Sequence, residues 1–414
     1  MHKVAFGSVP KDGGTFTFYR NLRPALLPHG IDLRCVTVGK KEASLIEPDY
    51  ADDGCVLLAS DTHNIKQQAQ VFADWCQQEE IDSVMAINSV AILSALPHLP
   101  SSVRVLSRCA NGFAEGYRVT LSSRARLMAI VALTPRLQND LIEQYGVAPQ
   151  KIHLIPNGID PSPFAANKST DLQNKRELLN LERPIQLGFM GRLEHGQKGV
   201  LYLPKIVQAL QQSNISFRLR IAGKGVHQPL LEKKLAPSIA AGQVELIGTL
   251  TKEEVPIFLK TTEVFLFTSH FEGCPNALLE AMMAGCAPVA FLIEGITNFL
   301  IDHKRTGFIA PMGDCDALAS YVAQLSADRD LLQQVAIAAQ NQAQTSFTSQ
   351  VAAKNYAQLF KQIIAAPLPQ FEPLPWSQFK VDSVYRKRWT AYAPKPLRTF
   401  VKNALKNVAI RQSV

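Results

Sequence analysis

Two basic residues, Arg192 and Lys198, lie six positions apart in a stretch that also contains Gly191, Gly196 and Gly199. A guanidinium can bind two phosphate oxygens at once, and a lysine ammonium supplies a compact positive charge. The stretch follows an apolar run at 185–190 and precedes a helical pattern, so we expect a strand-to-helix loop. The spacing predicts a diphosphate site, and an ordinary solvated loop is the alternative.

This stretch differs from a P-loop. Gln197 occupies the position of the motif's lysine, and Lys198 the position of its serine or threonine. Gly223-Lys224-Gly225 likewise begins a dinucleotide fingerprint, but Gln228 stands where the last glycine is required. We therefore exclude both motifs.

Two carboxylates, Glu272 and Glu280, lie eight positions apart in a segment that predicts a strand, a loop and a helix with Pro275 in its first turn. Glu280 falls among Ala, Leu and Met residues, where an unpartnered carboxylate is costly to bury. A carboxylate can accept hydrogen bonds from two adjacent sugar hydroxyls. Free N–H groups at the helix start, around Asn276 and Ala277, can meet phosphate or sugar oxygens. A capping acid and a surface glutamate are the alternative.

Paired glycines, Gly13 and Gly14, follow the first apolar run and precede another helical pattern. Such glycines let a ligand approach the backbone at a helix N-terminus. An ordinary turn is again the alternative.

The elements that must position these residues form two series of alternating strands and helices. We expect strands at 2–6, 32–38, 55–59, 83–87, 103–107, 127–134 and 153–155, and then at 185–190, 217–222, 244–247, 264–268 and 288–291. Parallel strands need long crossovers, so the pattern predicts an α/β fold with two doubly wound parallel sheets. Ligands bind beyond the carboxyl ends of such strands, and the residues above all follow strands.

The break between the two series is the polar stretch 161–184. We predict an N-terminal domain over 1–165 and a C-terminal domain over 182–345. Helices near 346–366 are expected to return to the N-terminal domain, and a basic, aromatic tail occupies 367–414.

Together, Gly191-Arg192, Lys198-Gly199 and Glu272-x7-Glu280 resemble the retaining GT-B glycosyltransferases of family 4, also called glycosyl transferases group 1. The segment 155–160, Ile-Pro-Asn-Gly-Ile-Asp, closes the first series as in that family. The resemblance covers 1–365 and is strongest over 185–290. It implies two Rossmann-like domains facing across a cleft, and transfer of a sugar from a nucleotide-diphosphate donor to an acceptor hydroxyl with retention of configuration.

The resemblance also implies roles. Glu280 would bind the nucleotide ribose, Glu272 the donor sugar, and Arg192 and Lys198 the diphosphate, with the base near Gly223 and Gly248. The catalytic set is Arg192, Lys198 and Glu272; the donor-binding set is Gly13, Gly14, Gly191, Arg192, Lys198, Glu272, Gly273, Cys274, Pro275, Asn276, Ala277 and Glu280. We expect removal of the Lys198 charge to reduce turnover far more than stability, because a loop lysine holds little core.

The sequence departs from the family on the acceptor side. Many relatives carry a catalytic-site histidine after a strand of the N-terminal domain, and the comparable stretch 107–116 has none. Arg108, Asn111 and Glu115 are the candidates there. A nucleotide-sugar epimerase of the same fold and a non-catalytic sugar-nucleotide-binding subunit are the alternatives to a transferase. The acceptor could be a glycan, a lipid or a small molecule.

We expect no cofactor and no metal ion. Asp314-Cys315-Asp316 resembles a metal-binding Asp-x-Asp, but it precedes a helical pattern, so Asp314 fits a helix N-cap better. Of the histidines, His29 and His153 are expected to be structural, and His270 to pack or form hydrogen bonds.

The net charge of +8 is confined to the tail, because 380–414 carries nine Lys/Arg and one acid. A neutral body disfavours a nucleic-acid-binding protein. Apolar residues between 397 and 408 share one helical face, which predicts a helix that either lies on an anionic membrane or packs on the N-terminal domain. Short apolar runs and seven scattered cysteines favour a cytoplasmic protein, with peripheral contact to the inner face of the membrane as an option.

Overall fold

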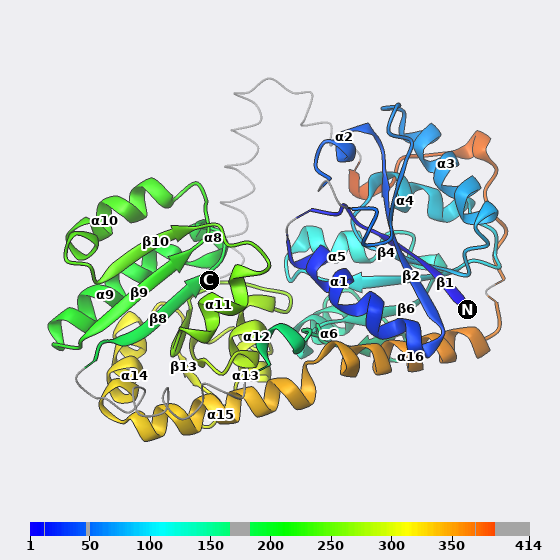
Figure 1. Cartoon of the computed structure of the whole chain (residues 1–414). Helices are drawn as coiled ribbons and strands as arrows, with labels where there is room; N and C mark the ends of the chain where they lie inside the picture. Colours follow the sequence, from blue (N-terminus) through cyan, green and yellow to red (C-terminus); the bar gives the residue numbers. More distant parts are fainter. Residues whose placement is uncertain (12, 47–49, 166–182, 369, 386–414) are drawn as a thin grey trace, which may run out of the picture.

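The computed structural model describes residues 1–11, 13–46, 50–165, 183–368 and 370–385. These residues form two parallel sheets flanked by helices, one in each half of the chain (Figure 1). The α/β class with two doubly wound sheets is therefore confirmed.

The N-terminal sheet has the order β3-β2-β1-β4-β5-β6-β7. Its strands are β1 (His2–Gly7), β2 (Ile31–Val38), β3 (Cys55–Leu58), β4 (Ser83–Ala86), β5 (Arg104–Cys109), β6 (Leu127–Ala132) and β7 (Ile152–Leu154). The flanking helices are α1 (Gly14–Leu26), α2 (Lys40–Ala43), α3 (Ile65–Gln78), α4 (Val90–Ala95), α5 (Ala114–Thr120) and α6 (Pro135–Glu143). The strand order reverses between β1 and β4, which opens a crevice at their carboxyl ends.

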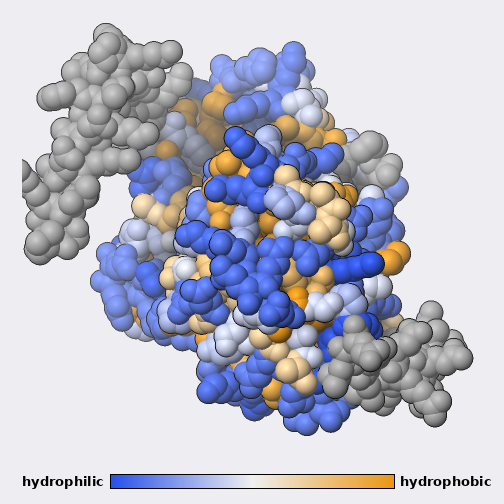
Figure 2. Space-filling view, turned by 90° about the vertical axis from the view of Figure 1, so that its left-hand side faces the viewer, coloured by the Kyte–Doolittle hydropathy of each residue, from blue (hydrophilic) through white to orange (hydrophobic). Residues whose placement is uncertain are grey.

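The C-terminal sheet is wound in the same way, with the order β10-β9-β8-β11-β12-β13. Its strands are β8 (Ile185–Met190), β9 (Phe217–Ala222), β10 (Val244–Gly248), β11 (Val264–Phe267), β12 (Ala287–Phe291) and β13 (Phe308–Ala310). The helices are α8 (His195–Lys198), α9 (Leu203–Gln212), α10 (Gln228–Ala240), α11 (Glu254–Lys260), α12 (Asn276–Met283), α13 (Thr297–Leu300) and α14 (Cys315–Ala327). The outer face of this half is mainly hydrophilic, with scattered apolar residues (Figure 2).

Two details of this half differ from the sequence-based expectation. Strand β13 was not expected, because it has only three residues and follows a polar turn. The sequence pattern predicts a helix near 199–213 directly after the loop, but α9 begins at Leu203, because Gly199 adopts a left-handed conformation and a 3-10 turn fills Val200–Tyr202.

Two long helices return the chain to the N-terminal half. Helix α15 (Arg329–Ser346) packs on α12, and α16 (Ser349–Ala365) packs along α1, as Figure 1 shows. Thr348 caps α16 by accepting a hydrogen bond from the Val351 N–H. Backbone hydrogen bonds join Ile159 to Phe347 (2.8 Å) and Ser349 (2.9 Å), so the two passages between the halves meet at one point.

Beyond α16, residues 370–385 lie on the N-terminal half. Trp376 stacks on His98 with ring centroids 4.4 Å apart, and the Tyr385 hydroxyl donates to Asn88 Oδ1 at 2.9 Å. We call this segment the strap. The predicted amphipathic helix at 397–408 and Trp389 lie outside the described residues. In the part of the chain that is described, no helix is long and apolar enough to cross a membrane.

Candidate functional site

The loop 191–199 leaves the carboxyl end of β8 and carries both predicted cations. The Glu194 carboxylate caps the short helix α8 by accepting from the Gly196 N–H (2.6 Å) and the Gln197 N–H (2.8 Å), which lowers the pKa of Glu194. Arg192 is exposed and donates to Gln197 Oε1 at 2.6 Å. The cap and this bond fix the loop locally, with the Arg192 guanidinium at the surface.

Lys198, unlike Arg192, is largely buried and pairs with Glu272. Its Nζ lies 2.6 Å from Glu272 Oε1, and the two side chains are only 16% and 9% exposed. The sequence did not indicate this partner, and we now expect removal of Lys198 to lower stability as well as turnover, because it would leave a nearly buried carboxylate without its cation.

The start of α12 lies against the N-terminal half. Pro275 occupies the N-cap position, one residue before the first turn where it was expected. The Asn276 amide donates to the Gly14 carbonyl (3.3 Å) and accepts from Asn157 Nδ2 (2.6 Å). Ala277 lies in the first turn, half-buried. This helix end therefore contacts the turn between β1 and α1.

The two residues before Pro275 are also at the contact between the halves. Cys274 is buried; burial raises the pKa of its thiol to about 11, and its carbonyl accepts from Asn157 Nδ2 at 3.1 Å. Gly273 lies so close to the N-terminal half that a Cβ there would be 1.9 Å from the Ala110 carbonyl oxygen. Only a glycine allows this approach.

A cavity of about 400 Å³ lies between the two halves. Gly13, Gly14, Asn276 and Glu280 line it together with residues that follow β10. An adjoining hollow of about 250 Å³ is lined by Gly191, Arg192, Gly223 and Lys224. The two share Met190, Thr249, Leu250 and Val255, so they form one cleft at the carboxyl ends of the C-terminal strands.

Six residues of the predicted donor-binding set thus line the cleft, together with Gly223, predicted near the base. The other six, Lys198, Glu272, Gly273, Cys274, Pro275 and Ala277, lie in the adjoining loops and in the first turn of α12. The sequence analysis did not predict that the stretch 249–255 lines the cleft. Its position directly after a strand of the second series is the signal that could have identified it.

Glu280 is the most unusual group in the cleft. Its carboxylate is half-buried, has no ion-pair or hydrogen-bond partner among the described residues, and faces the larger cavity. Burial raises the pKa of Glu280 to about 7. A lone carboxylate in such a place is available to a ligand that brings hydrogen-bond donors.

The three acceptor-side candidates, Arg108, Asn111 and Glu115, line one small cavity of about 110 Å³ with Thr15 and Asn88. Thr15 directly follows Gly14 of the cleft. The Asn111 side chain is exposed, and the exposed Glu115 carboxylate pairs with Arg118.

Arg108 differs from the other two because its guanidinium is buried. It donates to Asn157 Oδ1 at 2.5 Å and lies 3.9 Å from the centroid of the Phe18 ring, and burial lowers its pKa. Its Nε has no partner in the described part of the molecule. These contacts connect β5 to the 155–160 segment and leave the exposed side of the cavity to Asn111 and Glu115.

Three other expectations concern residues outside the cleft. Asp314 Oδ1 accepts from the Ala317 N–H at 2.9 Å, which confirms the helix cap. His270 forms hydrogen bonds with Tyr202 and Gly196. No group of three or more His, Cys, Asp or Glu side chains placed to hold a metal ion occurs among the described residues.

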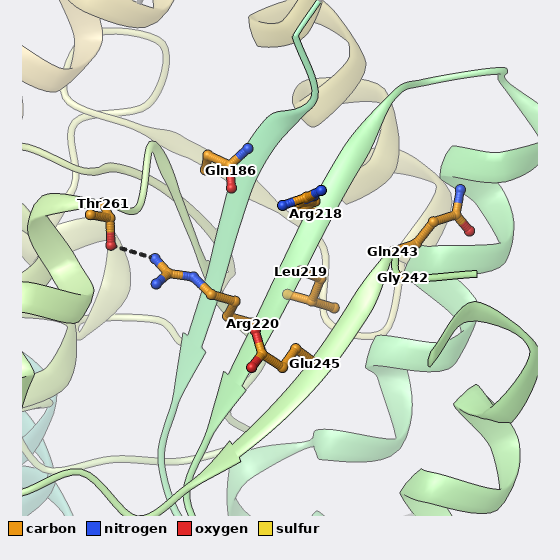
Figure 3. A pocket seen from close by; sticks show the side chains of 8 residues that line it. All are labelled: Gln186, Arg218, Leu219, Arg220, Gly242, Gln243, Glu245 and Thr261. Carbon is orange, nitrogen blue, oxygen red and sulfur yellow. Dashed lines mark hydrogen bonds between the residues drawn. The ribbon is translucent and has the colours of Figure 1, made fainter. Parts of the chain in front are cut away.

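A further hollow of about 410 Å³ lies at the opposite end of the C-terminal sheet (Figure 3). Arg218 and Arg220 project from β9 there, and Arg220 donates to Thr261 Oγ1 at 2.7 Å. These residues lie toward the amino ends of their strands, away from the edge where open parallel sheets bind ligands.

Comparison with known proteins identifies the class of the molecule. Residues 184–328 match the family described as glycosyl transferases group 1, and residues 12–163 match glycosyltransferase family 4. HepE from Anabaena, solved in complex with UDP, superposes with a TM-score of 0.70 over 87% of this chain and all of that one, at 18% identity. A Rickettsia africae glycosyltransferase gives a TM-score of 0.70 at 14% identity, over 88% and 99% of the two chains. The fold is GT-B.

The two family matches together cover more than two thirds of the chain, which belongs to the group 1 glycosyltransferases. Among curated proteins it is similar to the amylovoran biosynthesis glycosyltransferase AmsK of Erwinia amylovora, 29% identical over 55% of each chain. It is also 29% identical to an Escherichia coli UDP-Gal:alpha-D-GlcNAc-diphosphoundecaprenol alpha-1,3-galactosyltransferase, over 46% of this chain and 49% of that one. The matched segments span about half the length of these relatives.

Proposed function

We propose that this protein transfers a sugar from a nucleotide-diphosphate donor to an acceptor hydroxyl, with retention of configuration and without a metal ion. The observation that carries the proposal is the Glu280 carboxylate in the cavity between the halves, which has no partner in the described part of the chain. The two hydroxyls of a ribose supply the donors that this carboxylate lacks. HepE, with the same fold, was solved with UDP and with UDP-glucose, which is consistent with such a ligand.

The diphosphate would lie beside the loop 191–199. Arg192 provides an exposed guanidinium, and Lys198 a cation behind it that is held by Glu272. The first N–H groups of α12, after Pro275, add the positive end of a helix. These fixed charges can stabilise the departing diphosphate, which is the main electrostatic requirement of the reaction.

In the reaction we favour, the acceptor hydroxyl attacks the anomeric carbon from the same face of the sugar from which the diphosphate departs. The bond between the anomeric carbon and the phosphate oxygen breaks, and its electron pair leaves with the diphosphate. The acceptor oxygen forms the new bond on the same face, and its proton passes to the departing phosphate oxygen. Of the carboxylates near the donor, Glu272 is held by Lys198 and Glu280 is the one we assign to the ribose, so neither is assigned as a nucleophile and a glycosyl-enzyme intermediate is less attractive.

The acceptor would enter through the cavity of Asn111 and Glu115. Thr15 of that cavity and Gly14 of the cleft are adjacent in the chain, so the two spaces meet at the turn between β1 and α1. A glycan, a lipid or a small molecule would each bring a hydroxyl to this point.

The test begins with binding. We expect one of UDP, GDP and ADP to raise the thermal midpoint of the purified protein, because a ligand at 100 times its Kd adds about 2.7 kcal/mol of stability. Glu280→Gln should abolish this shift, whereas Glu143→Gln on the exposed end of α6 should retain it. A shift that survives Glu280→Gln unchanged contradicts the ribose contact.

Turnover then separates the function from its alternatives. Incubation with the sugar nucleotide of the preferred base should release nucleoside diphosphate and give a product of retained configuration by NMR, in the presence of EDTA. Conversion of the donor sugar without acceptor would identify an epimerase. Tight binding with neither hydrolysis nor transfer would indicate a non-catalytic subunit.

A further inference from the structure

Three histidines gather at the loop that carries Arg192 and Lys198, one of them within it. His195 lies in α8, His227 directly precedes α10, and His270 follows β11. The ring centroid of His195 is 5.1 Å from that of His270 and 6.3 Å from that of His227, and Tyr202 packs edge-on against His195 and His270. We call these three residues the histidine cluster. They bring three separate segments together at one loop.

Two members of the cluster accept hydrogen bonds from the loop backbone. His227 Nδ1 accepts from the His195 N–H at 3.2 Å, and His195 Nδ1 accepts from the Leu201 N–H at 3.3 Å. A backbone N–H can only donate, so both Nδ1 atoms must be unprotonated, and the tautomer with hydrogen on Nε2 follows. Protonation of either Nδ1 would place two donors face to face at one end of α8.

His270 behaves differently. Its Nδ1 lies 3.2 Å from the Gly196 carbonyl oxygen, so this nitrogen carries the hydrogen. Its Nε2 lies 3.0 Å from the Tyr202 hydroxyl, which can donate or accept. His270 can therefore take up a proton without losing either bond, and the acid-sensitive members are His195 and His227.

The charged groups around the cluster do not favour protonation. Glu194 already accepts two backbone N–H groups, and Glu272 is paired with Lys198. Arg192 and Lys198 are cationic. Burial, followed by the neighbouring His270 and His227, lowers the pKa of His195.

We propose that neutral His195 and His227 are positioning residues that hold the loop 191–199 in the conformation that binds diphosphate, and that their protonation releases the loop. The diphosphate as ligand rests on the proposed function, whereas the link between the imidazoles and the loop conformation does not. Neither side chain needs to touch the ligand, because both act through the backbone at the ends of α8.

The test uses asparagine, whose Oδ1 can accept in place of Nδ1 but does not titrate. The variants are His195→Asn, His227→Asn and the double substitution, with His195→Ala lacking the acceptor. His303→Asn is the matched control, because His303 Nδ1 accepts from the Ile309 N–H at 3.0 Å in a turn before β13.

The first measurement is UDP affinity by calorimetry at pH 8.0 and 5.5. UDP and Glu280 titrate in every variant. We therefore compare, between each variant and the wild type, the factor by which the affinity for UDP falls from pH 8.0 to pH 5.5. We expect wild type and His303→Asn to lose at least tenfold more affinity on acidification than the double asparagine variant. We also expect His195→Ala to bind weakly at both pH values. Identical pH profiles for wild type and the double variant would overturn the proposal.

The second measurement needs no ligand. Protection factors for the His195 and Leu201 amides, from hydrogen exchange, should fall between pH 8.0 and 5.5 in the wild type and stay constant in the double variant. If the double variant does not fold, the single variants replace it. Protection should then stay constant at the Leu201 amide in His195→Asn and at the His195 amide in His227→Asn. Constant wild-type protection over this range contradicts the proposal. Absence of UDP binding at pH 8.0 together with acid-sensitive protection would instead contradict the choice of UDP as donor nucleotide and support the role of the histidines.

Discussion

The ammonium of Lys198 and the carboxylate of Glu272 are 2.6 Å apart, although 74 positions separate them in the chain. The pair joins the loop after β8 to the loop before α12, and both side chains are largely withdrawn from water. A phosphate that binds Lys198 must therefore either share the ammonium with Glu272 or displace the Glu272 carboxylate from it. The two residues act as one unit in the site.

The first prediction concerns this unit. Lys198→Met should lower the free energy of unfolding by about 3–5 kcal/mol, because it leaves the Glu272 carboxylate buried without a cation. Urea denaturation measures the loss. The exposed Lys205→Met is the control and should change stability by less than about 0.5 kcal/mol.

The double variant Lys198→Met with Glu272→Gln separates stability from function. We expect it to regain most of the lost stability, since no buried charge remains, and yet to release nucleoside diphosphate at least a hundredfold more slowly than the wild type. Wild-type turnover in the double variant would count against the assigned roles.

The second prediction follows from Glu280. Burial holds its pKa at about 7, above the usual 4.5, so the folded protein keeps a proton that the unfolded chain releases between these values. Its contribution to stability is full below pH 4.5 and is lost as the pH rises through 7. Glu280→Gln should therefore match the wild type near pH 4.5 and exceed it at pH 8 by up to roughly 3 kcal/mol.

Denaturation curves of the ligand-free protein at several pH values check this dependence. Glu143→Gln should show no such trend. A Glu280→Gln variant that is less stable than the wild type at pH 8 would show that the carboxylate has a partner we have not identified.

The strands of both sheets were predictable because buried parallel strands are continuous apolar runs. The positions of the loop residues were also predictable in outline, since Gly14, Arg192 and Asn276 each follow a strand and ligands bind at that edge. Strand β13 was not predicted, because three residues after a polar turn are too few to show a strand pattern.

Side-chain partners in the site could not be predicted in the same way. The Lys198–Glu272 pair depends on how close two loops lie in the folded chain, and the burial of Arg108 depends on how the surrounding segments pack. A pattern of residue types along the sequence does not contain these distances. Residue type also gave no sign that Arg108, which lines the cavity of the acceptor-side candidates, is buried and bonded to Asn157, because arginine is rarely buried.

The third prediction concerns the contact between the halves. In Gly273→Ala the new methyl group would meet the Ala110 carbonyl at 1.9 Å, so we expect the halves to move apart. We expect a larger radius of gyration by small-angle X-ray scattering and weaker nucleotide binding. Gly242→Ala, where φ is +70° and nothing lies within 4 Å, should lower stability without changing the radius of gyration. An unchanged radius in Gly273→Ala would indicate that the loop alone adjusts.

The fourth prediction concerns the strap. Trp376→Ala removes the stack on His98 and should cost about 1–3 kcal/mol of stability, given that the indole is half-buried. Leu374→Ala is the control, because Leu374 contributes backbone bonds to Pro97 and His98 while its side chain is exposed. Equal stability of the two variants would mean that the ring stack does not secure the strap.

The bonds of Ile159 to Phe347 and Ser349 also constrain motion. The chain leaves the N-terminal half after Ile159 and returns to it through Phe347 and Ser349, and these bonds join the two segments at this point. The two crossings between the halves therefore share one fixed contact beside Ile159. Any swing of one half against the other is smallest beside Ile159 and grows with distance from it, so the far rim of the cleft is where substrate exchange would gain the most room.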